Sequence, residues 1–144
     1  MTRSRKPIRV LVADDSPTAL RSVCDYLEFA GGFEIVGTAS DGMNAIQLTS
    51  LKKPDLVLLD LSMPRVNGLE AAEQIRLSSP DLRLIIFSEL HGLSLGDECR
   101  RHGADGFVHK SLLPEGLLSE IDRIFSLRPP FAAGRSGVRE SSLP

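Results

Sequence analysis

The chain has 144 residues, enough for one domain, and its net charge of −2 gives no reason to expect a polyanionic partner. Hydrophobic residues at 42% and charged residues at 25% are ordinary for a globular protein, and no apolar run approaches the roughly 18 residues of a membrane span. Cys24 and Cys99 lie outside any CxxC spacing, and no apolar leader precedes them. We therefore expect reduced thiols, a cytosolic location and no membrane contact.

The two ends of the chain differ in composition from its middle. The N-terminal basic cluster is interpreted as a solvated tail rather than a nucleic-acid contact. It consists of Arg3, Arg5, Lys6 and Arg9. Residues 129–144 are rich in Pro, Gly, Ser and Arg, which predicts a disordered tail or a linker stub. The predicted division is a tail over residues 1–7, a folded domain over residues 8–127 and a second tail over residues 128–144.

Between these ends, short apolar runs alternate with segments of helical periodicity. The predicted strands are Ile8–Ala13, Phe33–Gly37, Leu56–Asp60, Leu82–Phe87 and Gly106–Lys110. The predicted helices begin at Ser16-Pro17, Asp41, Asn67-Gly68, Ser94 and Pro114, where capping residues or a first-turn proline stand. Strands and helices that alternate in this way predict an α/β fold, with a five-stranded parallel sheet covered by helices on both faces.

The fourth predicted helix is weaker than the others. Ser94-Leu95-Gly96-Asp97 resembles a capping box, but Gly96 stands in the first turn. Leu95 and Cys99 are the only apolar pair before Gly103 ends the segment. We expect this helix to be weakly held and free to shift.

Polar residues close four of the five predicted strands. They are Asp14, Asp15, Asp60, Ser88 and Lys110. The carboxyl ends of parallel strands meet at one edge of a sheet, so these side chains are expected to gather there. Three carboxylates would repel one another without a cation, and Mg²⁺, which prefers oxygen ligands and keeps several waters, suits the site.

Carboxylate, Mg²⁺, ammonium and hydroxyl groups together are what phosphoryl transfer requires. Asp60 is the best candidate for the nucleophile because it ends the most apolar strand, within reach of Lys110 and of the metal. Taken singly, an Asp after a strand is more often a helix cap, and a lone Lys or Ser at such a place says little. The occurrence of all these residues together, each at its own strand end, favours a phosphoryl-transfer site over these structural roles.

These residues carry a family resemblance that spans Ile8 to Phe125. The motifs are Asp14-Asp15-Ser16-Pro17, Asp60-Leu61-Ser62-Met63-Pro64 with Asn67-Gly68, Ser88, and Gly103-Ala104-Asp105-Gly106-Phe107 leading to Lys110-Ser111. Together they resemble the receiver domains of two-component response regulators, above all those joined to LuxR-type helix-turn-helix outputs. The receiver domain would occupy residues 8–127.

The resemblance implies a role for each site residue. Asp60 would accept a phosphoryl group from a histidine kinase or a histidine phosphotransfer protein. Mg²⁺ would be bound by Asp15, by the Asp60 carboxylate and by the backbone carbonyl of Ser62, with Asp14 acting partly through water. Ser88 and Lys110 would contact the phosphoryl oxygens. Ser88 and Phe107 would form the switch that reports phosphorylation to a downstream effector.

Three departures from the family pattern bear on rate and switching. Ser111 stands where many receivers have proline, so the bend after Lys110 must form without a cis-proline turn there. Glu89 replaces a small residue and brings a negative charge beside the phosphoryl pocket. Phe107 lacks the hydroxyl group of the commoner tyrosine, and it could also be an ordinary core aromatic.

Other functions remain open or are excluded. The chain could be the receiver part of a DNA-binding transcriptional regulator, although the 19 residues after Phe125 are too few for a helix-turn-helix. It could also be an adaptor that works without phosphorylation, and a homodimer is compatible with either function. A dehalogenase-type phosphatase would need DxD at Asp60, and nucleotide binding would need a GxGxxG or Walker A loop. We expect no enzyme beyond a domain that catalyses its own phosphorylation and dephosphorylation. His91, His102 and His109 lack metal-ligand spacing and are expected at the surface.

Overall fold

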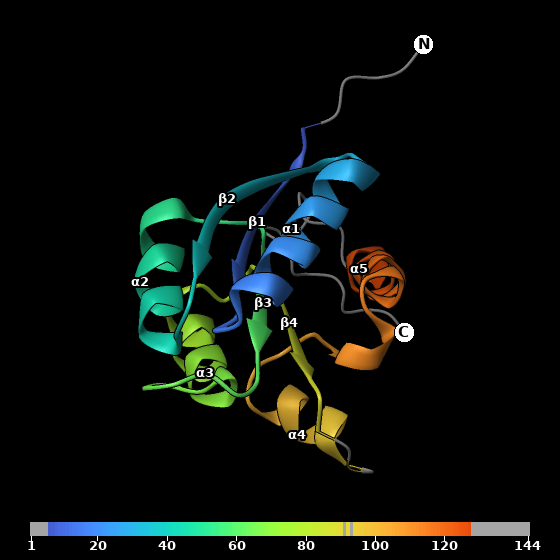
Figure 1. Ribbon diagram of the computed structural model, residues 1–144. Coiled ribbons are helices and arrows are strands. Elements are labelled where there is room, and N and C mark those ends of the chain that lie inside the picture. Colours follow the sequence, from blue (N-terminus) through green and yellow to red (C-terminus); the bar gives the residue numbers. More distant parts are fainter. Residues whose placement is uncertain (1–5, 91, 93, 128–144) are drawn as a thin grey trace.

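The computed structural model describes residues 6–90, 92 and 94–127, and it contains one five-stranded parallel sheet (Figure 1). The strand order is β2-β1-β3-β4-β5, so the chain crosses over between β2 and β3. The strands are β1 (Ile8–Ala13), β2 (Phe33–Ala39), β3 (Leu56–Asp60), β4 (Arg83–Ser88) and β5 (Gly106–His109). The helices are α1 (Pro17–Ala30), α2 (Gly42–Lys52), α3 (Gly68–Ser78), α4 (Leu95–Arg101) and α5 (Glu115–Leu127), with the short 3₁₀ helix η1 (Lys110–Leu112) before α5. The predicted α/β fold is confirmed.

Helices cover both faces of the sheet, and the alternation of side chains along β3 shows why this strand is apolar throughout. Leu56 and Leu58 point into the cluster beneath α1 and α5. Val57 and Leu59 point into the cluster beneath α2, α3 and α4. A central parallel strand must be apolar on both sides because both sides are buried.

Most helix starts follow the capping signals in the sequence. The Ser16 hydroxyl accepts the Ala19 amide at 3.2 Å, and the Asp41 carboxylate accepts the Asn44 amide at 2.8 Å. Asn67 forms a full capping box with Glu70 at the start of α3. Ser94 makes no side-chain cap, so the predicted capping box there is wrong, and α4 is only seven residues long. Each of these caps accepts a hydrogen bond from an amide in the first turn and so fixes the residue at which the helix begins.

Several boundaries differ from the prediction. Strand β2 continues to Ala39, where Gly37 was expected to end it. Strand β5 ends at His109, and Lys110 opens η1 instead of closing the strand. The bend after Lys110 is therefore a single 3₁₀ turn, and the cis peptide bond lies farther on, at Leu113–Pro114.

The terminal segments were only partly predicted. Arg9 belongs to β1: its amide donates to the Asp55 carboxylate at 2.9 Å and its guanidinium to the Lys53 carbonyl at 2.7 Å. The interpretation of Arg9 as part of a solvated tail is therefore wrong. Arg3, Arg5 and residues 128–144 lie outside the described residues.

The cysteines carry free thiols and pack against opposite faces of the sheet, Cys24 from α1 and Cys99 from α4. Within the described part of the chain, no helix is both long enough and apolar enough to cross a membrane.

One arginine joins α3 to the segments around α4 and β5. The Arg76 guanidinium donates to the Gly103 carbonyl at 2.8 and 3.0 Å and to the Leu82 carbonyl at 2.7 Å. It also pairs with Asp105 at 2.8 Å, and the same carboxylate oxygen accepts the Leu84 amide. The C-terminal end of α4 is thereby fastened to the sheet, whereas its N-terminal end lacks a side-chain cap.

The Gly42→Ala variant is expected to lose about 2 kcal/mol or more of unfolding free energy because a Cβ at this position would overlap the Val66 carbonyl oxygen. The close approach of Gly42 and Val66 packs the loop between β3 and α3 against the start of α2. Urea unfolding measures the loss. Gly96→Ala is the control because its Cβ would meet nothing nearer than 3.5 Å. Equal stability of the two variants would contradict the argument.

Candidate functional site

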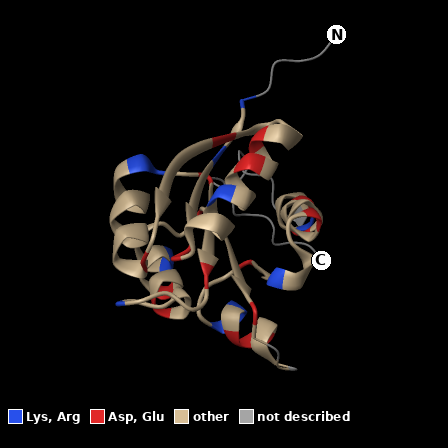
Figure 2. Ribbon diagram, viewed as in Figure 1, with Lys and Arg blue, Asp and Glu red and all other residues tan. Residues whose placement is uncertain are grey.

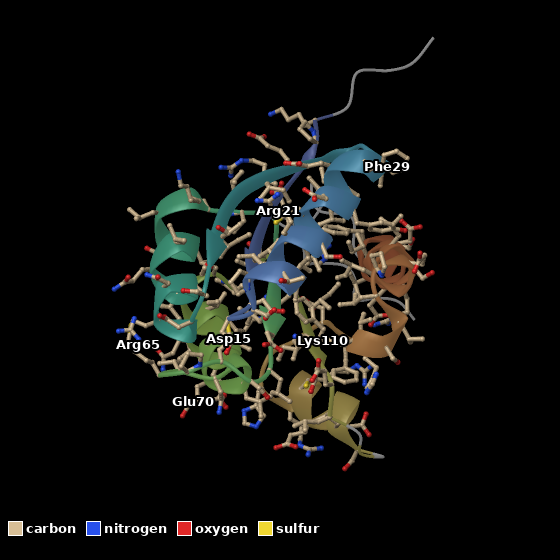
Figure 3. All side chains as sticks on the ribbon, in the orientation of Figure 1. Asp15, Arg21, Phe29, Arg65, Glu70 and Lys110 are labelled. Atoms are coloured by element: carbon tan, nitrogen blue, oxygen red, sulfur yellow. The ribbon has the colours of Figure 1, made fainter. Side chains whose placement is uncertain are left out.

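The polar residues predicted to gather at the carboxyl edge of the sheet do so. Asp14 and Asp15 follow β1, Asp60 ends β3, and Lys110 follows β5. Acidic residues mark the ends of the central strands in Figure 2, and Figure 3 shows Asp15 and Lys110 on either side of the lower end of β3. One oxygen from each of the three carboxylates lies within 4.8 Å of the other two.

A single ammonium group faces two buried carboxylates. Lys110 Nζ lies 3.0 Å from Asp14 Oδ2 and 3.3 Å from Asp60 Oδ1. Asp14 is 1% exposed and Asp60 is 4% exposed. The ammonium also lies 5.5 Å from the centre of the Phe87 ring, which helps to hold it at the edge of the sheet. Because one positive charge cannot balance two buried negative charges, the site is electrostatically unsatisfied.

The pKa values express this imbalance. Burial, and next the negative charge of Asp14, raise the pKa of Asp60 to about 6, although the Lys110 ammonium acts in the opposite direction. Burial by itself would lower the pKa of Lys110, but the contacts with Asp14 and Asp60 outweigh it and raise that pKa. Lys110 is therefore a fixed positive charge, while the ionised form of Asp60 is disfavoured.

The donor set fits a hard divalent cation. Asp14 Oδ2 is buried and, apart from its ion pair with Lys110, accepts no hydrogen bond of good geometry. Asp15 is exposed, so its carboxylate leaves the cluster open to solvent. Three oxygen donors at a wet edge suit an ion that keeps part of its water shell.

The loop after β3 fixes the Asp60 backbone. The Leu61 amide donates to the Phe87 carbonyl at 2.9 Å, and the Leu61 carbonyl accepts the Gly68 amide at 2.8 Å. A Cβ at Gly68 would lie 2.5 Å from the Asp60 carbonyl oxygen, so the start of α3 must come this close. Ser62, the predicted backbone ligand, follows directly in this loop and is exposed.

The two predicted switch residues lie on the side of β4 and β5. Ser88 is buried at the end of β4, and its hydroxyl oxygen accepts the Leu90 amide at 2.9 Å. Phe107 is half-buried and packs against the cluster beneath α4, close to Gly96. The described contacts connect Ser88 to its own loop rather than to Asp60, and they give Phe107 a packing partner in α4.

Sequence reasoning missed the contacts of two further residues around the site. Arg65 adopts a positive φ of 69° and pairs with Asp41 at 3.0 Å, which joins the loop after β3 to the cap of α2. His109, expected only to be a surface residue, contacts the Glu89 carbonyl at 3.1 Å and Ser111. Arg65 and Asp41, like His109 and Glu89, are far apart in the sequence. The contact of His109 with Ser111 depends on the orientation of the imidazole ring, so no local sequence pattern indicates any of these contacts.

Comparisons with known proteins agree with this geometry. Residues 10–122 match the family model of the response regulator receiver domain. The nitrate/nitrite response regulator NarL of Escherichia coli K12 is 33% identical over 141 residues, which are 98% of this chain and 62% of NarL. The chain thus spans about three fifths of the length of this relative.

Solved structures are similar over most of the chain. A LuxR-family two-component response regulator from Aurantimonas sp. SI85-9A1 has a TM-score of 0.80 and 30% identity, covering 85% of this chain and 88% of that one. A chain of the CheX–CheY–BeF3–Mg²⁺ complex from Borrelia burgdorferi has a TM-score of 0.75 and 29% identity, covering 85% of this chain and 90% of that one. Together with the acidic edge of the sheet, these matches show that the chain belongs to the response regulator receiver domain family and works in two-component signalling.

Proposed function

We propose that Asp60 accepts a phosphoryl group from a phosphohistidine of a histidine kinase or a histidine phosphotransfer protein. The observation that carries this proposal is the position of Asp60: its buried carboxylate lies 3.3 Å from the Lys110 ammonium and beside two further carboxylates. A buried, partly neutralised carboxylate at the open edge of a sheet is suited to nucleophilic attack.

The transfer is a displacement at phosphorus. A carboxylate oxygen of Asp60 forms a bond to phosphorus while the bond from phosphorus to the donor imidazole nitrogen breaks. The donor ring carries a proton on its other nitrogen, so the imidazole that leaves with the electron pair is neutral after the transfer, and Asp60 becomes an acyl phosphate. Lys110 would pair with a phosphoryl oxygen, and the 3.3 Å contact of its ammonium with the attacking carboxylate supports this role. Ser88 would donate its hydroxyl proton to another of these oxygens.

The residues that would hold Mg²⁺ are Asp14, Asp15 and Asp60, with the backbone carbonyl of Ser62. When bound, the ion neutralises charge on the transferring phosphoryl oxygens. The similar chain from Borrelia burgdorferi is part of a complex that contains Mg²⁺ and BeF3, which supports this choice of metal.

The partners follow from the reaction. We place the exchange in the cytosol, with a kinase or phosphotransfer protein as donor and a downstream effector as recipient of the signal, and a homodimer is one form that the activated state could take. The 33% identity over 118 residues to YxjL of Bacillus subtilis, a transcriptional regulatory protein, favours a transcriptional output as the second candidate function. The receiver itself acts as a switch and catalyses only its own phosphorylation and dephosphorylation.

Incubation with acetyl phosphate and Mg²⁺ tests the proposal. We expect one phosphoryl group per chain, located by borohydride trapping and peptide mass spectrometry on the segment that contains Asp60, and none when a chelator removes the metal. A label on a serine or histidine, or no label at all, would refute it. Release of the phosphoryl group by neutral hydroxylamine distinguishes an acyl phosphate, which this nucleophile cleaves, from a serine phosphate, which it leaves intact.

A further inference from the structure

The imidazole of His109 joins the two loops that flank the acceptor site. On one side Nε2 lies 3.1 Å from the backbone carbonyl oxygen of Glu89, in the loop after β4. On the other side Nδ1 accepts the Ser111 amide at 3.1 Å and lies 2.8 Å from the Ser111 hydroxyl. A carbonyl oxygen can only accept a hydrogen bond, so Nε2 carries the proton and Nδ1 is the acceptor.

The Glu89 end of this contact stands next to Ser88. The Ser88 hydroxyl accepts the Leu90 amide at 2.9 Å, so the short segment Ser88–Leu90 is held once by its own hydroxyl and once by His109. The Ser111 end stands next to Lys110, whose ammonium contacts Asp60. The His109 side chain therefore links Glu89, which follows Ser88, to Ser111, which follows Lys110. Ser88 and Lys110 are the two residues expected to contact the phosphoryl oxygens.

We propose that His109 is a positioning residue that ties the Ser88 loop to the Lys110 turn, so that the hydroxyl and the ammonium keep a common position around Asp60. This inference rests on the proposed function, because it concerns the group that Asp60 would carry. Without the tether, the Ser88 loop would sample positions from which its hydroxyl misses the phosphoryl oxygens and water reaches the acyl phosphate.

Two conservative variants separate the two ends of the imidazole. In His109→Asn the amide oxygen takes the place of Nδ1, which keeps an acceptor for the Ser111 amide and removes the donor to Glu89. In His109→Gln the amide nitrogen reaches the place of Nε2, which keeps the donor to Glu89 and removes the close acceptor. His109 is half-exposed, so both substitutions leave the core intact.

The experiment has two readouts, the exchange rate of the Leu90 amide before phosphorylation and the lifetime of the acyl phosphate made with acetyl phosphate and Mg²⁺. We expect His109→Asn to speed Leu90 exchange and to shorten the lifetime, each by about fivefold, the effect of one lost hydrogen bond. His109→Gln should stay within about twofold of wild type in both, because the link to Glu89 is retained. A purely structural role would lower the stability of both variants and would not separate them.

Equal acyl phosphate lifetimes in the two variants would overturn the proposal, and so would unchanged Leu90 exchange in His109→Asn. If wild type accepts no phosphoryl group, the proposed function fails, and the tether is then judged by Leu90 exchange alone, which needs no phosphorylation.

Discussion

The Asp60→Asn variant is expected to accept no phosphoryl group and, in a chelating buffer above about pH 7, to be more stable than wild type by on the order of 2 kcal/mol. The carboxamide keeps the shape of the side chain but removes one of the two buried negative charges that share the Lys110 ammonium. A site that loses its nucleophile and gains stability has been shaped by function rather than by folding.

The pH dependence of the unfolding free energy shows why Asp60→Asn is expected to be more stable than wild type, and not less. Burial and the charge of Asp14 raise the pKa of Asp60 from 3.8 to about 6, so the folded protein keeps the Asp60 proton to a higher pH than the unfolded chain does. Folding stability therefore falls as the pH rises from about 4 to about 6, and the loss is complete above that range. Asp60→Asn lacks this titration, so its advantage should be small near pH 4 and full near pH 8.

Urea unfolding of both proteins across this pH range measures the difference. Asp97→Asn, which changes an exposed carboxylate of α4, is the matched control and should follow wild type. If Asp60→Asn were no more stable than wild type near pH 8, the Lys110 ammonium would be sufficient to balance both the Asp14 and the Asp60 carboxylates. The electrostatic argument would then be wrong.

The fold could be predicted because its determinants are local. The apolar run of Leu56–Asp60, the Ser16-Pro17 start and the Asn67 cap each act within a few residues, and the structure shows all three. The acidic edge was also predictable, since strand direction alone brings Asp14 and Asp60 to the same side of the sheet.

What the sequence did not reveal depends on distant partners or on the orientation of a single side chain. Arg76 looks like an ordinary exposed helix residue until the chain brings Gly103 and Asp105 beside it. Lys110 was expected to close a strand, but the ring of His109 accepts the Ser111 amide and begins a 3₁₀ turn one residue earlier. Such contacts decide exact boundaries, and local propensity carries no information about them.

Mg²⁺ is expected to stabilise wild type against unfolding and to have little effect on the Asp15→Ala variant. Asp15 is exposed, so its removal creates no cavity and leaves the ion pairs of Lys110 with Asp14 and Asp60 in place. The variant therefore tests the third carboxylate of the cluster without disturbing the other two. The affinity of wild type should be weak, because few protein ligands at an open edge leave several waters on the ion.

A titration of the unfolding transition with Mg²⁺ measures the effect. At ten times the dissociation constant, bound ion adds about 1.4 kcal/mol to the unfolding free energy. Asp97→Ala removes a carboxylate of similar exposure that lies outside the cluster, so it should respond to Mg²⁺ as wild type does. A general salt effect would stabilise all three proteins alike, and it would appear with Na⁺ at equal ionic strength. If Asp15→Ala and wild type gave the same Mg²⁺ curve, the ion would be bound without Asp15 and the three-carboxylate site would have to be abandoned.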